Sequence, residues 1–181
     1  MRTLREIYND TRLGTKYGDK GTVHSYIELY ESYISKFRKD CSILELGVGY
    51  GESLIMWEDY IESGLVVGVQ HSINNHLAEI IEKYDLNVIN VSATSRRLPE
   101  MLDNNKFDVI IDDASHKLID QIESFKNLRE FVKPGGYYFI EDVEDIDYAR
   151  GEFEALHLDC TIHDMRAEKD RFDNVVVAYK F

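Results

Sequence analysis

The chain has 181 residues, of which 44% are hydrophobic, and carries a formal net charge of −13. This length and this apolar fraction suit one globular domain, which we expect to span residues 1–181. The excess of acid argues against a nucleic-acid partner, because phosphate binding needs clustered Lys and Arg. Small neutral or cationic ligands and divalent metals remain compatible with this charge.

Neither a membrane anchor nor a disulfide is expected. No run approaches the roughly 20 apolar residues that a membrane-spanning helix needs, and the first residues lack the apolar core of a signal peptide. Cys41 and Cys160 lie far apart and match no metal or redox spacing. These features favour a cytoplasmic protein without disulfides.

Residues 1–40 are predicted to form a mostly helical lead-in to a core over residues 41–181. Helical spacing of apolar residues predicts the buried face of the lead-in. The residues expected on that face are Tyr26, Ile27, Tyr30, Tyr33 and Ile34.

Short Val/Ile-rich runs alternate with helical patterns after residue 41, which is typical of parallel strands covered on both faces. The five predicted strands are Ser42–Leu46, Leu65–Val69, Asn87–Val91, Phe107–Ile111 and Gly136–Ile140. The clearest helix is predicted over Lys117–Val132, and Lys133–Gly136 is expected to turn the chain into the next strand.

The last part of the chain has a different pattern. Asp159–Met165 and Asn174–Tyr179 are predicted strands joined by a polar loop too short for a crossover helix, so we expect an antiparallel pair. The fold class predicted is therefore α/β: a doubly wound, mostly parallel seven-stranded sheet that ends in an antiparallel C-terminal pair.

Three glycines at alternate positions follow the first core strand, within the run ELGVGYGES of residues 45–53. Glycines allow sharp turns and a close approach to a ligand, and the helix that follows offers free N–H groups. The spacing is not the Gly-x-Gly-x-x-Gly of dinucleotide binders. The pattern resembles the first motif of class I S-adenosylmethionine-dependent methyltransferases, with an ordinary strand–helix turn as the alternative.

Acidic side chains follow the fourth and fifth predicted strands, at Asp113, Glu141 and Asp142. Neighbouring parallel strands end about 5 Å apart, so these carboxylates are expected to gather at one edge of the sheet. Gathered carboxylates repel unless a cation neutralises them, and Mg²⁺ prefers such oxygens. The alternatives are that Asp112 or Asp113 caps the next helix and that residues 141–147 form a solvated acidic loop.

His116 lies three residues after Asp113, near the predicted start of a helix. A neutral imidazole there could accept a proton from a substrate hydroxyl. The positive end of the helix is expected to lower the pKa of His116 and favour the neutral form. The alternative is a surface or capping histidine.

Five runs make the resemblance narrower: DKGTVHSYIELYE (19–31), ELGVGYGES (45–53), IDDASH (111–116), KPGGYYFIEDVED (133–145) and DNVVVAY (173–179). Together they resemble the metal-dependent sugar O-methyltransferases of macrolide biosynthesis, the mycinamicin and demethylmacrocin group, with their cephalosporin hydroxylase-like relatives. The similarity extends from about Gly18 to Tyr179.

The resemblance implies transfer of a methyl group from S-adenosylmethionine to a hydroxyl of a sugar or glycosylated small molecule. It implies Mg²⁺ or another divalent cation on Asp113, Glu141 and Asp142, with His116 as general base. The residues it assigns to the cofactor are Glu45, Gly47, Gly49, Gly51, Gln70, Ser92 and Asp112.

Three positions depart from the family pattern. Gln70 stands where an acid normally holds the ribose hydroxyls, and Ser92 lies where an acid near the adenine is usual. Ala114 replaces a glycine, which is tolerated unless the backbone there needs a positive φ. The first two departures leave a non-catalytic protein of the same fold, or a nucleotide or NAD enzyme, as rival hypotheses. A chain without a lid domain is also expected to complete its acceptor pocket with a second subunit, as a homo-oligomer.

Overall fold

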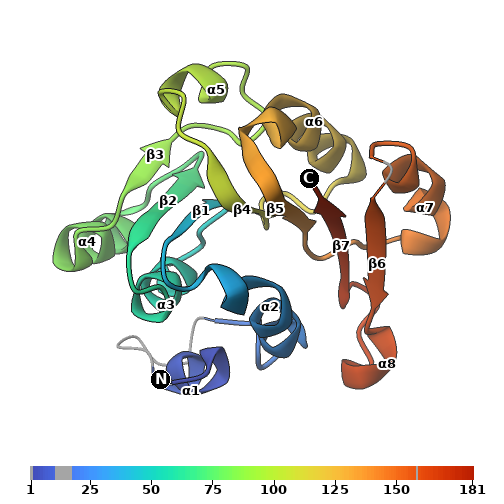
Figure 1. The fold of residues 1–181 in the computed structure, drawn as a ribbon, viewed down its shortest axis with the longest axis horizontal. Helices are drawn as coiled ribbons and strands as arrows, with labels where there is room; N and C mark the ends of the chain where they lie inside the picture. The colour runs from blue at the N-terminus through green and yellow to red at the C-terminus, as the bar shows by residue number, and fades with distance from the viewer. Residues whose placement is uncertain (1, 11–17, 158) are drawn as a thin grey trace.

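The computed structural model describes residues 2–10, 18–157 and 159–181. A seven-stranded sheet with the order β3-β2-β1-β4-β5-β7-β6 forms the centre of the molecule (Figure 1). The strands are β1 (Cys41–Leu46), β2 (Gly64–Gln70), β3 (Val88–Asn90), β4 (Phe107–Asp112), β5 (Val132–Ile140), β6 (Cys160–Asp164) and β7 (Val175–Lys180). The first five strands are parallel, whereas β7 runs antiparallel to both β5 and β6.

Helices cover both faces of this sheet (Figure 1). They are α1 (Leu4–Asn9), α2 (Tyr26–Ile34), η1 (Ser35–Phe37), α3 (Glu52–Tyr60), α4 (Asn75–Tyr84), α5 (Leu98–Met101), α6 (Leu118–Leu128), η2 (Arg129–Phe131), α7 (Ile146–Glu154) and α8 (Arg166–Lys169). Within the described ranges, none of these helices has the length and apolar character needed to cross a membrane.

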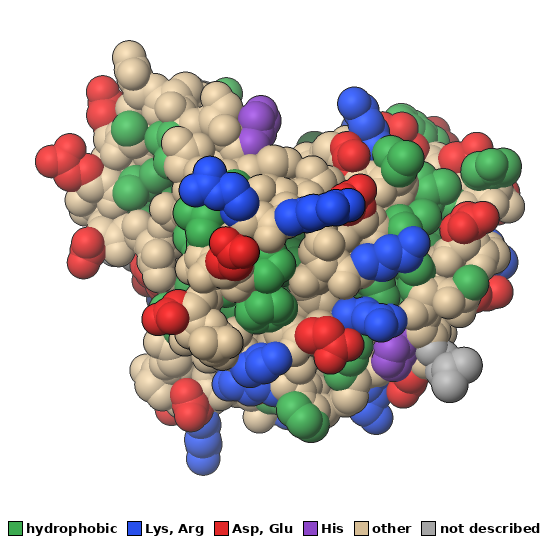
Figure 2. Space-filling view, turned by 90° about the horizontal axis from the view of Figure 1, so that it is seen from above, with side chains coloured by type: hydrophobic (Ala, Val, Ile, Leu, Met, Phe, Trp, Pro, Cys, Tyr) green, Lys and Arg blue, Asp and Glu red, His purple; other side chains and the backbone are tan. Residues whose placement is uncertain are grey.

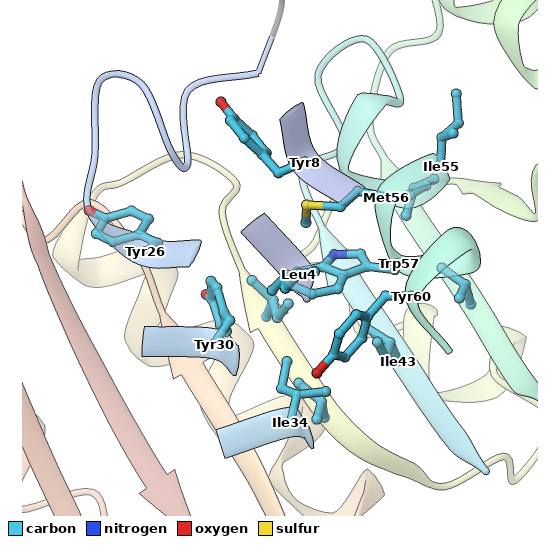
Figure 3. Close-up of a cluster of buried hydrophobic side chains, with 14 of the residues drawn as sticks. Leu4, Tyr8, Tyr26, Tyr30, Ile34, Ile43, Ile55, Met56, Trp57 and Tyr60 are labelled. Carbon is cyan, nitrogen blue, oxygen red and sulfur yellow. The ribbon is translucent and has the colours of Figure 1, made fainter. Parts of the chain in front are cut away.

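Alternate residues of the central strands enter two separate cores. Ile43 of β1 and Val109 of β4 point toward the face that carries α1, α2 and α3, and Figure 3 shows this cluster around Trp57. Leu44 and Ile110, one residue further along each strand, point to the face that carries α5, α6 and α7. This two-sided burial explains why the strands are continuously apolar.

The strand register brings the carboxyl ends of three strands together. Leu46 of β1 lies opposite Asp112 of β4, and Asp112 lies opposite Ile140 of β5. The residues that follow these strands therefore meet at one edge of the sheet, where ligands bind in folds of this kind.

The predicted fold class is confirmed, including all seven strands and the antiparallel tail. The predicted helix was too long, because α6 ends at Leu128 and the 3₁₀ turn η2 follows it. The prediction that Lys133–Gly136 turns the chain before the strand was wrong: β5 begins at Val132 and contains these residues. The pairing shifts there from Phe107–Val132 to Val109–Tyr137, which makes the segment a bulge within the strand.

The lead-in packs as predicted on the first of the two cores. Tyr26, Ile27, Tyr30 and Ile34 are fully buried, and Tyr33 is half-buried at the margin. Seen from the side of α5 and α6, acidic and basic side chains are interspersed with apolar ones (Figure 2). The net charge therefore does not gather on this face as a single acidic patch.

Candidate active site

The glycine loop joins β1 to α3 through three residues with positive φ: Gly47 (+82°), Gly49 (+51°) and Gly51 (+84°). A Cβ on Gly47 would lie 2.0 Å from the carbonyl oxygen of Asp113, so only glycine lets the two strand ends meet. A Cβ on Gly49 would meet nothing within 4 Å. A Cβ on Gly51 would instead meet Leu77 and Ile80 of α4 and the nearby Leu86 at 3.3 to 3.5 Å, and Gly51 does not line the larger cavity.

Two cavities flank this loop. The first, of about 320 Å³, is lined by Gly47, Gly49, Lys20, Asp113 and His116 among others. The second, of about 200 Å³, lies at the ends of β2, β3 and β4. Gly47, Gln70 and Ala114 line both cavities, so a ligand with two parts could occupy the two sides at once.

Five of the seven residues predicted to bind the cofactor line these cavities. Gly47, Gly49, Gln70, Ser92 and Asp112 do so, the last two in the smaller cavity. Glu45 and Gly51 do not line either cavity. Glu45 is completely buried and accepts a hydrogen bond of 2.7 Å from the hydroxyl of Ser53, a residue that does line the larger cavity.

The amide of Gln70 supports the glycine loop. Its Oε1 accepts a hydrogen bond of 3.1 Å from the backbone N–H of Val48, while Nε2 faces the carbonyl of Ser72 at 3.5 Å. The oxygen is thus engaged by the protein, and the NH₂ group is the part best placed to meet a ligand. A carboxylate here could bind Val48 with one oxygen and keep the other for a hydroxyl.

Lys20 links the three acid-bearing strand ends. Its Nζ lies 2.6 Å from Asp113 Oδ2, 2.7 Å and 2.8 Å from the two carboxylate oxygens of Glu141, and 3.3 Å from Glu45 Oε1. Glu141 also accepts a hydrogen bond of 2.6 Å from the hydroxyl of Tyr30. Both oxygens of Glu141 are therefore occupied by protein groups.

Burial and neighbouring charges shift the pKa values of the groups in this cluster. Burial, and then the neighbouring carboxylates, raise the pKa of Glu141 well above its ordinary value, and burial likewise raises the pKa of Glu45 and Asp142. Burial opposes the charge of Lys20, but the surrounding acids outweigh it and raise its pKa well above the ordinary value. The ammonium of Lys20 thus lies against three carboxyl groups, those of Glu45, Asp113 and Glu141, in a place whose acidic side chains suit a cation.

Asp142 lies near Asp113 on the side of His116, away from Lys20. Its Oδ1 accepts a hydrogen bond of 2.6 Å from Tyr26 and lies 3.5 Å from His24 Nδ1. That buried nitrogen has no hydrogen-bond partner among the described residues. Ligand atoms of Asp113, His116 and Asp142 lie within 4.8 Å of one another, as do those of Glu45, Asp113 and Glu141. The three predicted metal ligands thus divide between two groups that share Asp113.

His116 reaches Asp113 Oδ1 at 3.1 Å and Asp142 Oδ2 at 3.6 Å. The expectation of a lowered pKa was wrong. The hydrogen bond to Asp113, with the charge of Asp142, raises the pKa of His116 to about 9 despite partial burial. The predicted dipole effect is weak because His116 precedes the helix: α6 begins at Leu118, and His116 itself has φ +60°.

The structure contradicts the capping alternative and, for Glu141 and Asp142, the solvated-loop alternative, although Glu144, Asp145 and Asp147 are exposed. The cap of α6 is Lys117, with no side-chain cap hydrogen bond, so Asp112 and Asp113 do not cap this helix. Glu141 and Asp142 are buried, so they are not part of a solvated loop. Ala114 lacks a positive φ, which explains why the glycine is dispensable there.

At the sequence level Lys20 had no predicted role in the site, and His24 and Tyr26 had only a place at the site entrance or in the packing of the lead-in. The run DKGTVHSYIELYE contains all three, but spacing gives no sign that the lead-in reaches the far strand ends. Tyr26 and Tyr30 do sit four residues apart on one helix face. Their joint contact with Asp142 and Glu141 depends on how α2 docks.

Known proteins share this fold and sequence pattern. The methyltransferase domain family matches residues 44–143. The 8-demethyl-8-alpha-L-rhamnosyl tetracenomycin-C 2'-O-methyltransferase of Streptomyces olivaceus is 30% identical over 155 residues, 77% of this chain. The mycinamicin VI 2''-O-methyltransferase of Micromonospora griseorubida is 29% identical over 136 residues, 68% of this chain.

A solved structure, the MycE methyltransferase in complex with Mg and SAH, superposes with a TM-score of 0.66 at 26% identity. The match covers 83% of this chain and 39% of MycE. The chain spans 39% and 32% of the two curated relatives, less than half of either. With more than half of its length matched by the family, the chain belongs to the methyltransferase domain family.

Proposed function

We propose that this protein is an S-adenosylmethionine-dependent O-methyltransferase that uses a divalent cation, Mg²⁺ by preference, and methylates a hydroxyl of a sugar or glycosylated small molecule. One observation carries the proposal: two cavities that share the glycine loop open beside a buried acidic cluster and a histidine. The curated relatives are sugar O-methyltransferases by name, and MycE was solved with Mg and SAH, which supports the same assignment.

The cofactor would lie across the two cavities. The larger one would hold the methionine part near Gly49, and the smaller one the adenine near Ser92 and Asp112. Gln70, which lines both, would meet the ribose between them. The missing Cβ at Gly49 fits this arrangement, because nothing lies within 4 Å of its place and the backbone there is open to a closely bound ligand.

The residues present also fit a divalent cation. Asp113, Asp142 and Glu141 supply hard oxygen ligands, and ligand atoms of Asp113 lie within 4.8 Å of those of Asp142 in one group and of Glu141 in the other. When bound, such an ion would hold the acceptor oxygen and lower the pKa of its hydroxyl.

His116 would receive the proton of that hydroxyl while the oxygen attacks the sulfonium methyl, and S-adenosylhomocysteine would leave as a neutral thioether. A base must first be neutral, whereas Asp113 and Asp142 raise the pKa of His116 to about 9. The carboxylates that hold this proton are the ones assigned to the metal. Metal occupancy and the basic form of His116 are therefore expected to go together.

The test is calorimetric titration with S-adenosylhomocysteine and with Mg²⁺, followed by methyl-transfer assays on a panel of glycosides with and without EDTA. We expect micromolar cofactor binding and transfer that EDTA abolishes. Asp113→Asn should lose the heat of metal binding and the transfer while it keeps the fold. Asp85→Asn is the control, because Asp85 is exposed at the end of α4 and Asn tolerates its φ of +54°.

Failure of the cofactor to bind would contradict the proposal and favour the non-catalytic alternative. Binding of NAD in place of S-adenosylhomocysteine would favour the nucleotide-enzyme alternative. Full transfer in EDTA would remove the metal from the mechanism but leave the methyltransferase assignment intact.

Three lesser parts of the proposal concern the surroundings of the enzyme. We expect that the protein has no nucleic-acid partner. We also expect a cytoplasmic location, which suits the two free cysteines. Finally, we expect a homo-oligomer in which a second subunit completes the acceptor pocket. A stable monomer in light scattering would contradict the last of these.

A further inference from the structure

Lys20 belongs to the acidic cluster, but the proposed reaction does not use it. Its side chain is 4% exposed, yet it comes from the lead-in and not from any strand of the sheet. The carbonyl of Lys20 accepts a hydrogen bond of 2.9 Å from the N–H of Tyr26, which fixes the residue to the start of α2. From there its ammonium reaches acids that follow β1, β4 and β5.

The ammonium engages the groups that a divalent cation would need. It contacts Asp113 Oδ2 and both oxygens of Glu141 at 2.6 to 2.8 Å. Asp113 Oδ1 and Asp142 Oδ2 remain on the side of His116. Glu141 can therefore become a metal ligand only if Lys20 releases it.

We propose that Lys20 is a built-in cation that holds Glu45, Asp113 and Glu141 together before metal binds, and that it competes with the divalent cation for Asp113 and Glu141. This inference rests on the proposed function for the metal itself. Lys20 is a positioning residue in this scheme, since it acts through the carboxylates that it contacts.

The charges explain why Lys20 both holds the carboxylates together and competes with the metal ion. Without the ammonium, the carboxyl groups of Glu45, Asp113 and Glu141 would lie side by side, with His116 on one side of Asp113 as the neighbouring cation, which destabilises a folded chain. With the ammonium, the site is assembled in advance, but a divalent ion must approach a positive charge held a few ångströms away. Coulomb repulsion at that distance weakens metal binding.

The chemistry of lysine suits a cation that occupies a metal site until the metal binds. Its ammonium is a compact charge with three donors on a flexible stem, so it can satisfy several carboxylates and still withdraw. An arginine would match a single carboxylate in a fixed fork. The backbone anchor at Tyr26 would keep the residue nearby after its ammonium is displaced.

The test is calorimetric titration of Lys20→Met with Mg²⁺ in the absence of cofactor, together with thermal unfolding with and without Mg²⁺. Removal of the competing charge should tighten Mg²⁺ binding at least about tenfold. The metal-free variant should melt below the wild type, and saturating Mg²⁺ should narrow that difference, because the ion replaces the lost charge. Lys126→Met is the matched control: it removes an equal charge from the exposed face of α6 and should leave both measurements unchanged.

Lys20→Arg keeps the positive charge and should not tighten Mg²⁺ binding. If Lys20→Met does not fold without metal, refolding on addition of Mg²⁺ supports the inference, and failure to refold overturns it. If Lys20→Met folds but binds Mg²⁺ no more tightly than the wild type, the inference about Lys20 is also overturned. Mg²⁺ binding by the wild-type protein would in that case still support the proposed function. If neither protein binds Mg²⁺, the inference and the metal part of the proposed function both fail.

Discussion

At the scale of single residues, Gln70 is the departure from the family pattern with the most direct consequence. Its Oε1 is engaged by Val48 N–H at 3.1 Å, so the ligand can meet only the amide NH₂. Gln70→Glu should keep the bond to Val48 and add a charged acceptor for a ribose hydroxyl. Charge-assisted hydrogen bonds exceed neutral ones by about 1 kcal/mol, so we expect S-adenosylhomocysteine to bind roughly fivefold more tightly.

Calorimetric titration of the Glu variant measures this directly. Gln70→Met is the control of similar length: it leaves the N–H of Val48 without its partner and should bind more weakly than the wild type. A Glu variant that binds no better than wild type would mean that the ribose does not reach this residue.

The residues of the site divide into those that sequence can indicate and those that it cannot. Asp113, Glu141 and Asp142 were predictable because parallel strands put their carboxyl ends at one edge. Lys20 was not, because its position depends on the docking of a separate helix against three strand ends. The raised pKa of His116 was missed for a related reason: the carboxylates that cause it come from two different strands.

At the scale of elements, two glycines of the loop between β1 and α3 have different roles: Gly47 avoids a steric clash, whereas Gly49 only adopts a positive φ. Gly47→Ala would place a Cβ 2.0 Å from the backbone oxygen of Asp113, where neither chain can yield without parting β1 from β4. Gly49→Ala has open space and meets only the cost of its φ of +51°, about 1 to 2 kcal/mol. We expect Gly47→Ala to lower the free energy of unfolding by more than about 3 kcal/mol.

Urea denaturation of the two variants gives the comparison. Because the loop also places Asp113, Gly47→Ala should weaken metal binding as well, whereas Gly49→Ala should affect chiefly the ligand that fills its open space. Equal losses of stability in the two variants would contradict the steric argument.

The edge strand β6 is tied to α2 by His163, which lies 2.8 Å from the hydroxyl of Tyr33 through its Nε2. Burial lowers the pKa of His163 below its ordinary 6.5. The folded protein therefore resists protonation that the unfolded chain accepts. The contribution of His163 to stability is complete above pH 6.5 and is lost as the pH falls below that value.

His163→Gln removes this titration and keeps a polar group toward Tyr33. We expect its urea midpoint to fall less than that of the wild type between pH 7 and pH 5, although it is lower at pH 7. If both proteins lose equal stability over this range, other groups and not His163 govern the acid sensitivity of the edge.

The elements were largely predictable because strands buried on both faces carry a strong apolar signal. The end of α6 and the start of β5 were not. Leu128 and Val132 continue the helical spacing of apolar residues, so this spacing alone does not show where α6 ends. The bulge at Lys133–Gly136 depends on pairing with β4, a contact that no local pattern encodes.

At the scale of the whole molecule, the lead-in is part of the core and not an appendage. Figure 3 shows Leu4, Tyr30 and Ile34 of the lead-in around Trp57 of α3. Helix α2 also carries Tyr26 and Tyr30, which donate hydrogen bonds to Asp142 and Glu141 of the acidic cluster. Loss of the packing of α2 would therefore also disassemble the site. Residues 1–40 and the sheet are therefore expected to unfold as one unit, as a single domain over residues 1–181 requires.

Two internal probes test this expectation. Trp57 meets the ring of Tyr30 edge to face at 5.4 Å, so its fluorescence reports the docking of the lead-in. Cys41 is fully buried in β1, and burial raises the pKa of its thiol to about 12, so a thiol reagent reaches it only when the sheet opens. In a Cys160→Ser background, fluorescence and labelling should follow one urea transition. A fluorescence change at lower urea than the labelling of Cys41 would show that the lead-in detaches first and that the acidic cluster can lose Lys20 while the sheet stays folded.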